Sequence, residues 1–353
     1  MDFGITWAKI DDMEYVARAE ALGYTHLWVT DSQTIRSECF SVLTMAALKT
    51  RSMKIGVGVA VPGLRLAPVV ANGIATINRI APGRTFVALG TGNTAMRMLG
   101  RRPMRLKDFA EYIKVVQGLL RGEEVDYPDN GVNHKVRFML LDKGYINIED
   151  HIPLYLAGDG PKVQALAGEL AEGLVTMVVP RAETLRAVNA NVGEGAERSA
   201  RKVADFYLTV RANLVVLKPG EAVDSDRIVD EIGPSLMTMV HHMVDKQLET
   251  GAEPPEFLKP IWKDYLEFHM SRPQASRQQM MHEGHNVFVK PEERRFITPE
   301  MIKSFCMISR PEEVADQVRE LQRQGVRQIK CNFPPAGGYK MMQDFSRDVI
   351  EKM

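Results

Sequence analysis

The aspartate that ends an apolar segment is the clearest candidate for acid–base chemistry. Asp31 follows the run THLWVT (25–30), whose apolar and β-branched residues predict a buried strand. At the carboxyl end of a strand, its carboxylate can act on a ligand as an acid, a base or a hydrogen-bond acceptor. The same residue can equally serve as the N-cap or turn residue of a following helix. Residue type and position leave both roles open.

Two glycine-rich segments have the composition of ligand-binding loops. In AGDGPK (157–162), small residues let a ligand approach the backbone, and a helix that begins at the proline turns free N–H groups toward a phosphate. In GTGNT (90–94), hydrogen-bonding groups stand beside glycines that let a flat ring pack against the backbone, but the G-K-[ST] ending of a P-loop is missing. A phosphorylated, planar cofactor would use both segments, although either can also be a simple turn.

Histidine and cysteine residues do not form a recognisable catalytic or metal-binding motif. His241-His242 stand together, and MHEGH (281–285) places its histidines three residues apart, unlike the H-E-x-x-H zinc motif. We therefore expect these histidines to be solvated or packed, and we predict no metal site. The chain has no G-x-S-x-G motif, and Cys39 has no evident base nearby in the sequence.

The candidate loops follow strands of a repeating strand–helix pattern. Strands are predicted at residues 2–6, 25–30, 53–61, 84–90, 153–158, 174–179, 206–216 and 326–333. Eight such units favour an α/β fold of the closed (β/α)8 TIM-barrel type, because closure leaves no sheet edge to protect. A doubly wound sheet is the alternative, disfavoured because no G-x-G-x-x-G follows the first strand. In a barrel, the candidate loops would meet at the carboxyl ends of the strands.

Two segments exceed a minimal barrel, so we predict a single domain over 1–353 with two insertions. Residues 124–150 contain Asn130-Gly131, a hairpin signal, and predict an antiparallel excursion. Residues 218–305 carry Met and His in a mostly helical pattern and are far longer than an ordinary connection. Insertions after barrel strands lie at the catalytic face, which favours a lid over a pocket; a dimerisation or purely structural appendage is equally compatible.

Composition excludes several classes of protein. The 353 residues include 45 Lys plus Arg and 45 Asp plus Glu, and this zero net charge argues against binding to nucleic acid. Three cysteines, an odd number far apart in the sequence, argue against a disulfide framework and fit a reducing cytoplasm. The first residues carry acids and no long apolar run, so neither a signal peptide nor a membrane segment is predicted there.

Four segments taken together resemble the bacterial luciferase-like superfamily of flavin- and deazaflavin-dependent oxidoreductases. They are GYTHLWVTDSQ (23–33), residues 53–106 with NRIAPGRTFVALGTG, IPLYLAGDGPKVQALAGELAEGLVT (152–176) and RPEEVADQVRELQRQGVRQI (310–329). Within the superfamily they resemble the methylenetetrahydromethanopterin-reductase-like branch. The resemblance implies a luciferase-like TIM barrel interrupted by insertions and covers nearly the whole chain.

The resemblance also implies a cofactor site. It places the cofactor ring against a bulge of the third strand, often with a non-proline cis peptide; Gly56 and Gly58 in that strand independently indicate a bulge or a close backbone approach. The implied ring wall is Gly58, Val59 and Ala60, the ring-edge contacts are Asp31, Gly92 and Asn93, and the phosphate contacts are Ala157, Gly158, Asp159 and Gly160. Two positions depart from the family pattern: Ser32 stands where several deazaflavin enzymes have histidine, and Arg65-Leu66-Ala67-Pro68 replaces Arg-His-Pro.

The first functional expectation is a two-component monooxygenase. In this hypothesis a separate flavin reductase delivers reduced FMN, O₂ is the co-substrate, a small organic substrate is oxygenated, and Asp31 is the candidate catalytic residue. The alternative is hydride transfer by the deazaflavin coenzyme F420, and a second alternative is a flavin-binding protein without turnover. Members of the superfamily commonly form homodimers, which we expect here as well.

Overall fold

Eight parallel strands close into a barrel in the computed structural model, which describes residues 1–353. The barrel order is β1-β12-β9-β8-β7-β4-β3-β2. The strands are β1 (Asp2–Thr6), β2 (His26–Val29), β3 (Lys54–Ala60), β4 (Thr85–Leu89), β7 (Leu154–Ala157), β8 (Gly173–Thr176), β9 (Tyr207–Val210) and β12 (Val326–Cys331). The chain therefore has the closed (β/α)8 TIM-barrel fold that the sequence predicts.

Helices cover the outside of the barrel. They are α1 (Glu14–Ala21), α2 (Cys39–Lys49), α3 (Ala67–Ile80), α5 (Leu106–Leu120), α6 (Pro161–Leu170), α7 (Ala182–Arg198), α12 (Val314–Arg323) and α13 (Gly338–Asp348), with short 3-10 turns η1 (Leu141–Lys143) and η4 (Ile350–Lys352). The short helix α4 (Thr94–Arg97) lies instead at the carboxyl ends of the strands. In α3 the buried residues Val70, Ile74 and Ile77 recur at helical spacing, so one face packs against the strands.

Aromatic side chains fill the barrel interior and form the floor beneath its carboxyl ends. Trp28 and Phe86 pack with ring centroids 4.6 Å apart, and Tyr155 stacks on Tyr207 at 5.3 Å. The indole N–H of Trp28 donates to Oε1 of Gln328 at 2.8 Å, which fixes the ring. Because Trp28 is fully buried at this level, the space above it is the first place where the barrel can admit a ligand.

The prediction of a single strand over 206–216 is wrong. After β9, the chain leaves the barrel at Arg211 and continues as β10 (Asn213–Val216), which pairs in parallel with β11 (Cys306–Ser309) in a separate two-stranded sheet. The backbone N–H of Arg211 makes the last hydrogen bond to β8, donating to the carbonyl of Thr176 at 2.8 Å. Both halves are rich in β-branched residues, and no Gly or Pro separates them, so the sequence pattern runs on through the break.

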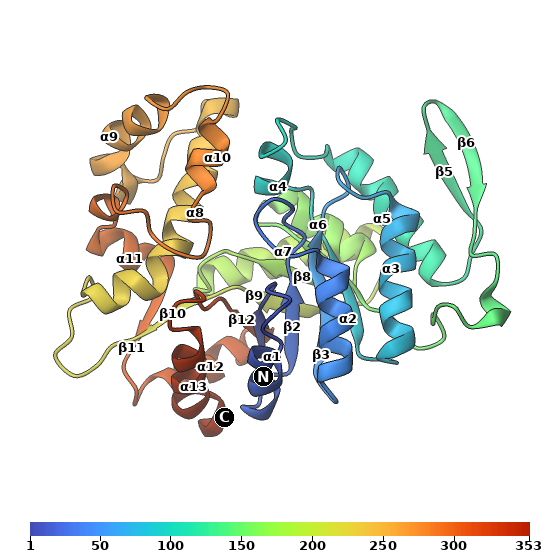
Figure 1. The fold of residues 1–353 in the computed structure, drawn as a ribbon, viewed down its shortest axis with the longest axis horizontal. Coiled ribbons are helices and arrows are strands. Elements are labelled where there is room, and N and C mark those ends of the chain that lie inside the picture. Colours follow the sequence, from blue (N-terminus) through green and yellow to red (C-terminus); the bar gives the residue numbers. More distant parts are fainter.

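A hairpin and a helical unit project from the barrel on opposite sides (Figure 1). The hairpin consists of β5 (Val125–Asp129) and β6 (Val132–Val136), with Asn130 and Gly131 at its tip in left-handed conformations, φ 48° and 79°. The helical unit contains α8 (Asp226–Thr250), η2 (Glu256–Leu258), α9 (Lys259–Met270), α10 (Arg277–His282), η3 (Arg294–Phe296) and α11 (Pro299–Phe305). The division into one domain with two insertions stays a prediction.

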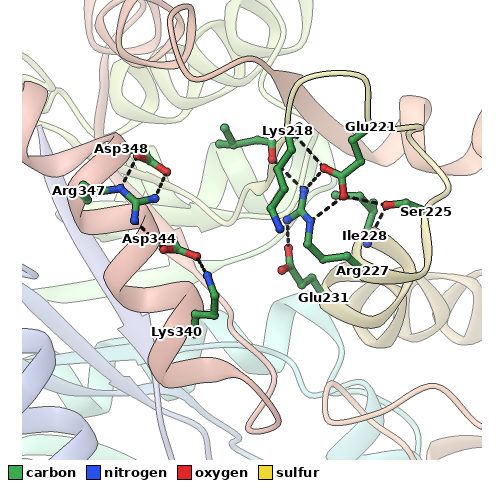
Figure 2. Close-up of polar contacts among 11 residues, drawn as sticks. Lys218, Glu221, Ser225, Arg227, Ile228, Glu231, Lys340, Asp344, Arg347 and Asp348 are labelled. Atoms are coloured by element: carbon green, nitrogen blue, oxygen red, sulfur yellow. Dashed lines mark hydrogen bonds and ion pairs between the residues drawn. The ribbon is translucent and has the colours of Figure 1, made fainter.

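The helical insertion has its own apolar core and is anchored where it leaves the barrel. Together with residues of β10 and β11 it forms a cluster of 17 buried residues that is separate from the barrel core. Figure 2 shows the anchor at the start of α8, where Arg227 binds Glu221 and Glu231 and Ser225 caps the helix. Arg227 also donates to the carbonyl of Val216 on β10 at 3.1 Å. In the same view, Lys340, Asp344 and Arg347 pair along α13. None of the helices, α8 included, has both the length and the apolar character of a membrane span.

Candidate active site

A cavity of about 300 Å³ opens at the carboxyl ends of the barrel strands. Most of the predicted site residues line it: Asp31, Gly58, Val59, Gly92, Asn93, Ala157, Gly158 and Asp159. Two do not: Ala60 is fully buried behind the wall, and Gly160 is the N-cap of α6. A cavity of about 320 Å³ lies at the opposite, amino-terminal ends of the strands, around Asp2 and Val326, where barrel enzymes do not place their chemistry. The binding roles of the individual residues stay predictions.

One wall of the cavity is backbone. The peptide bond between Gly58 and Val59 is cis, and the register with β4 shifts between Gly58 and Ala60, so the expected cis peptide and bulge are confirmed. A Cβ on Gly58 would lie 2.3 Å from Cε3 of Trp28. Glycine is therefore required here, and the indole packs directly against the bulge. The result is a flat surface against which a planar ring can lie.

The loop after β4 forms the adjoining wall and connects it to the insertion. Gly92 has φ +81°, and a Cβ there would meet Cγ1 of Val61 at 2.4 Å, so this position also requires glycine. Asn93 lines the cavity, but its side-chain amide is occupied: Oδ1 accepts from Nε of Arg97 at 2.6 Å, and Nδ2 lies 2.6 Å from Nδ1 of His242 on α8. The side chain of Asn93 therefore joins the barrel to the insertion above the cavity.

Asp31 is held by an arginine. Nε and an Nη of Arg65 donate to its two carboxylate oxygens at 2.8 and 3.0 Å, and the side chain is only 5% exposed. Arg65 also donates to Glu38, whose carboxylate caps α2. Because Glu38 is the N-cap of that helix, the alternative role of Asp31 as its N-cap is excluded. The bidentate pair presents Asp31 to the cavity as a hydrogen-bond acceptor of fixed orientation.

The expected phosphate end of the site has the geometry of an anion-binding helix terminus with one negative charge beside it. The ten-residue helix α6 begins at Pro161 with no side-chain cap and no acidic residue in its first turn. The carboxylate of Asp159 is turned toward β8, where Oδ1 accepts from Oγ1 of Thr176 and from the N–H of Met177 at 2.8 and 2.7 Å. A Cβ on Gly158 would lie 2.1 Å from Val163, whereas a Cβ on Gly160 would meet nothing within 4 Å.

Two basic residues of the cavity were missed by the sequence analysis. Arg211 follows β9, and Lys330 is the penultimate residue of β12; both line the cavity. An Nη of Arg211 donates to Oγ of Ser235 and to Oδ1 of Asn286 at 3.0 and 2.6 Å. Burial lowers the pKa of Arg211 to about 10, and burial together with Arg211 lowers the pKa of Lys330 to about 7. The available signal for Lys330 was the alternation of side chains along its strand, whereas Arg211 falls inside the run 206–216 that the sequence predicts as one strand.

The insertion adds histidines to the rim. His285 lines the cavity with Asn286, its ring centroid lies 5.2 Å from that of His282, and His282 lies 5.3 Å from His241. Burial, with mutual repulsion between the rings, lowers the pKa of His282 to about 2 and of His285 to about 3. These rings are neutral at physiological pH, and the innermost, His241, faces Glu293 at 3.4 Å.

The chain is similar to known proteins in both sequence and fold. A family model described as luciferase-like monooxygenase matches residues 10–328. The 5,10-methylenetetrahydromethanopterin reductase of Archaeoglobus fulgidus is 26% identical over 365 residues, covering 100% of both chains. Among solved structures, a coenzyme F420 dependent tetrahydromethanopterin reductase from Methanopyrus kandleri aligns with a TM-score of 0.73 at 20% identity, covering 99% of this chain and 98% of that one. The FMN-bound oxygenating constituent of 3,6-diketocamphane monooxygenase from Pseudomonas putida aligns with a TM-score of 0.64 at 14% identity, covering 100% and 99%.

Proposed function

The chain belongs to the luciferase-like family of oxidoreductases, and from this premise we propose that it is a coenzyme F420-dependent enzyme that transfers hydride to or from a small organic substrate. The observation that carries the proposal is the full-length similarity to a methylenetetrahydromethanopterin reductase, at 26% identity over both chains. The likeness to an FMN-bound monooxygenase is lower, at 14% identity. This evidence favours the deazaflavin alternative over the FMN- and O₂-dependent monooxygenase that the sequence analysis placed first.

The cavity fits a flat, phosphorylated cofactor. Gly58 and Gly92 line the cavity with backbone, because a Cβ at either position would collide with Trp28 or Val61, and Gly158 and Asp159, which come just before the uncapped start of α6, line the same cavity. When bound there, the deazaflavin ring would supply hydride donor and acceptor chemistry. The protein would hold the ring against Gly58 and Val59 and its phosphate at α6, in agreement with the predicted roles.

The remaining residues would orient the substrate and keep water out. Asp31, fixed by Arg65, offers two carboxylate oxygens as acceptors for an N–H or O–H of the bound molecules. His285 and Asn286 bring the insertion to the cavity rim, so the insertion forms part of the wall around the reacting atoms. An imine, an enone or a pterin-like molecule is the substrate class that this arrangement would suit.

Anaerobic titration tests the cofactor. The purified protein is titrated with F420 and, separately, with FMN, each oxidised and reduced, while the ring absorbance is followed. We expect the deazaflavin to bind more tightly by about tenfold or more, a difference of about 1.4 kcal/mol. Preference for reduced FMN, followed by substrate-dependent O₂ consumption with a flavin reductase, would overturn the proposal in favour of the monooxygenase. Binding of either cofactor without turnover on any acceptor would identify a flavin-binding protein.

A further inference from the structure

Lys330 occupies an unusual position at the floor of the cavity. Its side chain enters from β12, and its Nζ lies 5.2 Å from the centroid of the Trp28 ring. Trp28 in turn packs against Gly58 at the bulge, where the cofactor ring is expected. The residue is 8% exposed, and that exposure is toward the cavity it lines. Lys330 therefore lies next to the surface on which the ring would rest.

No negative charge in the protein compensates Lys330. No carboxylate lies within 4.0 Å of its Nζ, and its side chain makes none of the protein's hydrogen bonds. The other titratable groups of the cavity are accounted for: Asp31 is paired with Arg65, Asp159 is bound to β8, and burial keeps His285 neutral. The charged neighbour that acts on Lys330 is Arg211, a second cation.

Arg211 also lacks a counter-ion. Its side-chain hydrogen bonds go to three neutral groups, the Ser235 hydroxyl, the Asn286 amide oxygen and the Met177 sulfur, and it forms no ion pair. Asp159 attracts it only from a greater distance. Burying two neighbouring cations without a counter-ion is unfavourable in free energy. An anion that binds on their solvent side removes this penalty.

We propose that Lys330 and Arg211 form a site at the base of the cavity that receives the negatively charged part of a ligand. The inference rests on the proposed function and adds a ligand class to it. The anionic group can belong to the ring system of the cofactor or to a phosphate or carboxylate of the bound molecule. The chemistry is shared: delocalised negative charge that accepts hydrogen bonds from an ammonium and a guanidinium group.

Proton uptake on binding is the direct consequence. The pKa of Lys330 is lowered to about 7 in the free protein by burial and by Arg211, and a bound anion raises it. At pH 8 only about a tenth of the free protein carries this proton, so anion binding takes up about 0.9 proton per ligand, whereas at pH 6 it takes up about 0.1. Above pH 7 the affinity then falls by up to about tenfold per pH unit.

Isothermal titration calorimetry in two buffers of different ionisation enthalpy measures this proton. The probes are oxidised and reduced F420, the phosphate-free ring 8-hydroxy-5-deazariboflavin, and inorganic phosphate alone. The Lys330→Met variant removes the exchanging group, and the difference between the two proteins cancels ionisation of the probe itself. Lys330→Arg keeps the charge without exchange, and Lys263→Met, on the exposed face of α9, is the matched control.

We expect the difference in proton uptake between wild type and Lys330→Met to be about 0.8 or more at pH 8 and near zero at pH 6. Lys330→Arg should bind without the pH dependence, and Lys263→Met should behave as the wild type. Uptake with the phosphate-free ring assigns the anion to the ring, and uptake with inorganic phosphate alone assigns it to a phosphate; either supports the site.

A measurement on the unmodified protein guards against a folding defect in the variants. The Cε resonance of ¹³C-labelled Lys330 should titrate near pH 7 in the free protein and at higher pH with the ligand bound. If F420 binds but no proton is taken up and the resonance does not move, the anion site is refuted while the proposed function stands. If F420 does not bind the wild type at all, the proposed function itself fails.

Discussion

Mild acidification should selectively destabilise the protein through the histidines of the insertion. His282 is 2% exposed, and neither of its ring nitrogens has a hydrogen-bond partner. Burial first, and then His241, His285 and other nearby cations, lower its pKa to about 2. In the unfolded chain the pKa is about 6.5. Between these values the unfolded state binds a proton that the folded state does not, so stability is complete above pH 6.5 and is lost as the pH falls below it.

The magnitude follows from the two pKa values. From pH 7.5 to pH 5.5, a histidine whose folded pKa lies far below 5.5 loses about 1.3 kcal/mol of stability. The pKa of His285 is lowered to about 3 by burial and by nearby cations, so it contributes the same amount. These two histidines alone contribute a loss of about 2.6 kcal/mol, a large part of the roughly 5–15 kcal/mol of stability of a typical domain, and His269, whose pKa burial lowers to about 4, adds to it. Glu293, whose carboxylate has a pKa of about 2 beside His241 and Lys290, stays ionised over this range.

Urea denaturation at both pH values, followed by circular dichroism, measures the loss. In the His282→Leu variant about 1.3 kcal/mol of the pH dependence should disappear, because leucine binds no proton in either state. His134→Leu, on the exposed strand β6, is the matched control for the removal of an imidazole. An equal pH dependence in the wild type and His282→Leu would refute the reasoning, since the ring would then protonate as readily in the folded protein.

Three further perturbations test other parts of the site. Glu293→Gln should lower the free energy of unfolding by about 3–5 kcal/mol, measured at neutral pH, because it leaves Arg272 and Lys290 buried without their counter-charge; a change below about 1 kcal/mol would contradict this role. Asp31→Ala should lower turnover by about tenfold or more with an unchanged circular dichroism spectrum, and unchanged kinetics would remove Asp31 from catalysis. Gly160→Glu should weaken F420 binding more than Gly160→Gln does, because a Cβ there meets no neighbour and only the charge differs; equal affinities would place the phosphate elsewhere.

The fold could be predicted because local sequence patterns indicate the strands and helices of the barrel. Each barrel strand is a short apolar run, and each is followed by a turn or a helix start with the expected residue types. The error at 206–216 arose because the sequence contains no signal for the end of the strand: the chain leaves the barrel at Arg211 without a glycine or proline. The strand breaks because β10 pairs with β11 and not with a strand of the barrel. This is a tertiary interaction, and no local sequence signal indicates it.

The cofactor side of the cavity was accessible for a related reason. Glycines at 58 and 92 are required by contacts with Trp28 and Val61 on neighbouring strands, and all four residues lie in the segments 23–33 and 53–106 that carry the resemblance, so the resemblance carries the geometry with it. The pairing of Arg65 with Asp31 was not accessible. The two residues are 34 positions apart, and Arg65 lies in a segment that departs from the family pattern. Only the folded structure therefore shows that Arg65 forms an ion pair with Asp31.

The position of Lys330 in the cavity could have been predicted from the alternation of side chains along its strand. Side chains alternate along a strand, and Gln328 points into the barrel, where it binds Trp28. Two residues further on, Lys330 must point the same way, and because β12 ends at Cys331 this is the last inward position before the cavity. Thr209 and Arg211 repeat the relation on the neighbouring strand. A basic residue at the last inward position of a barrel strand can neither reach bulk solvent nor pack on a helix. Its side chain therefore contacts the ligand that the cavity binds.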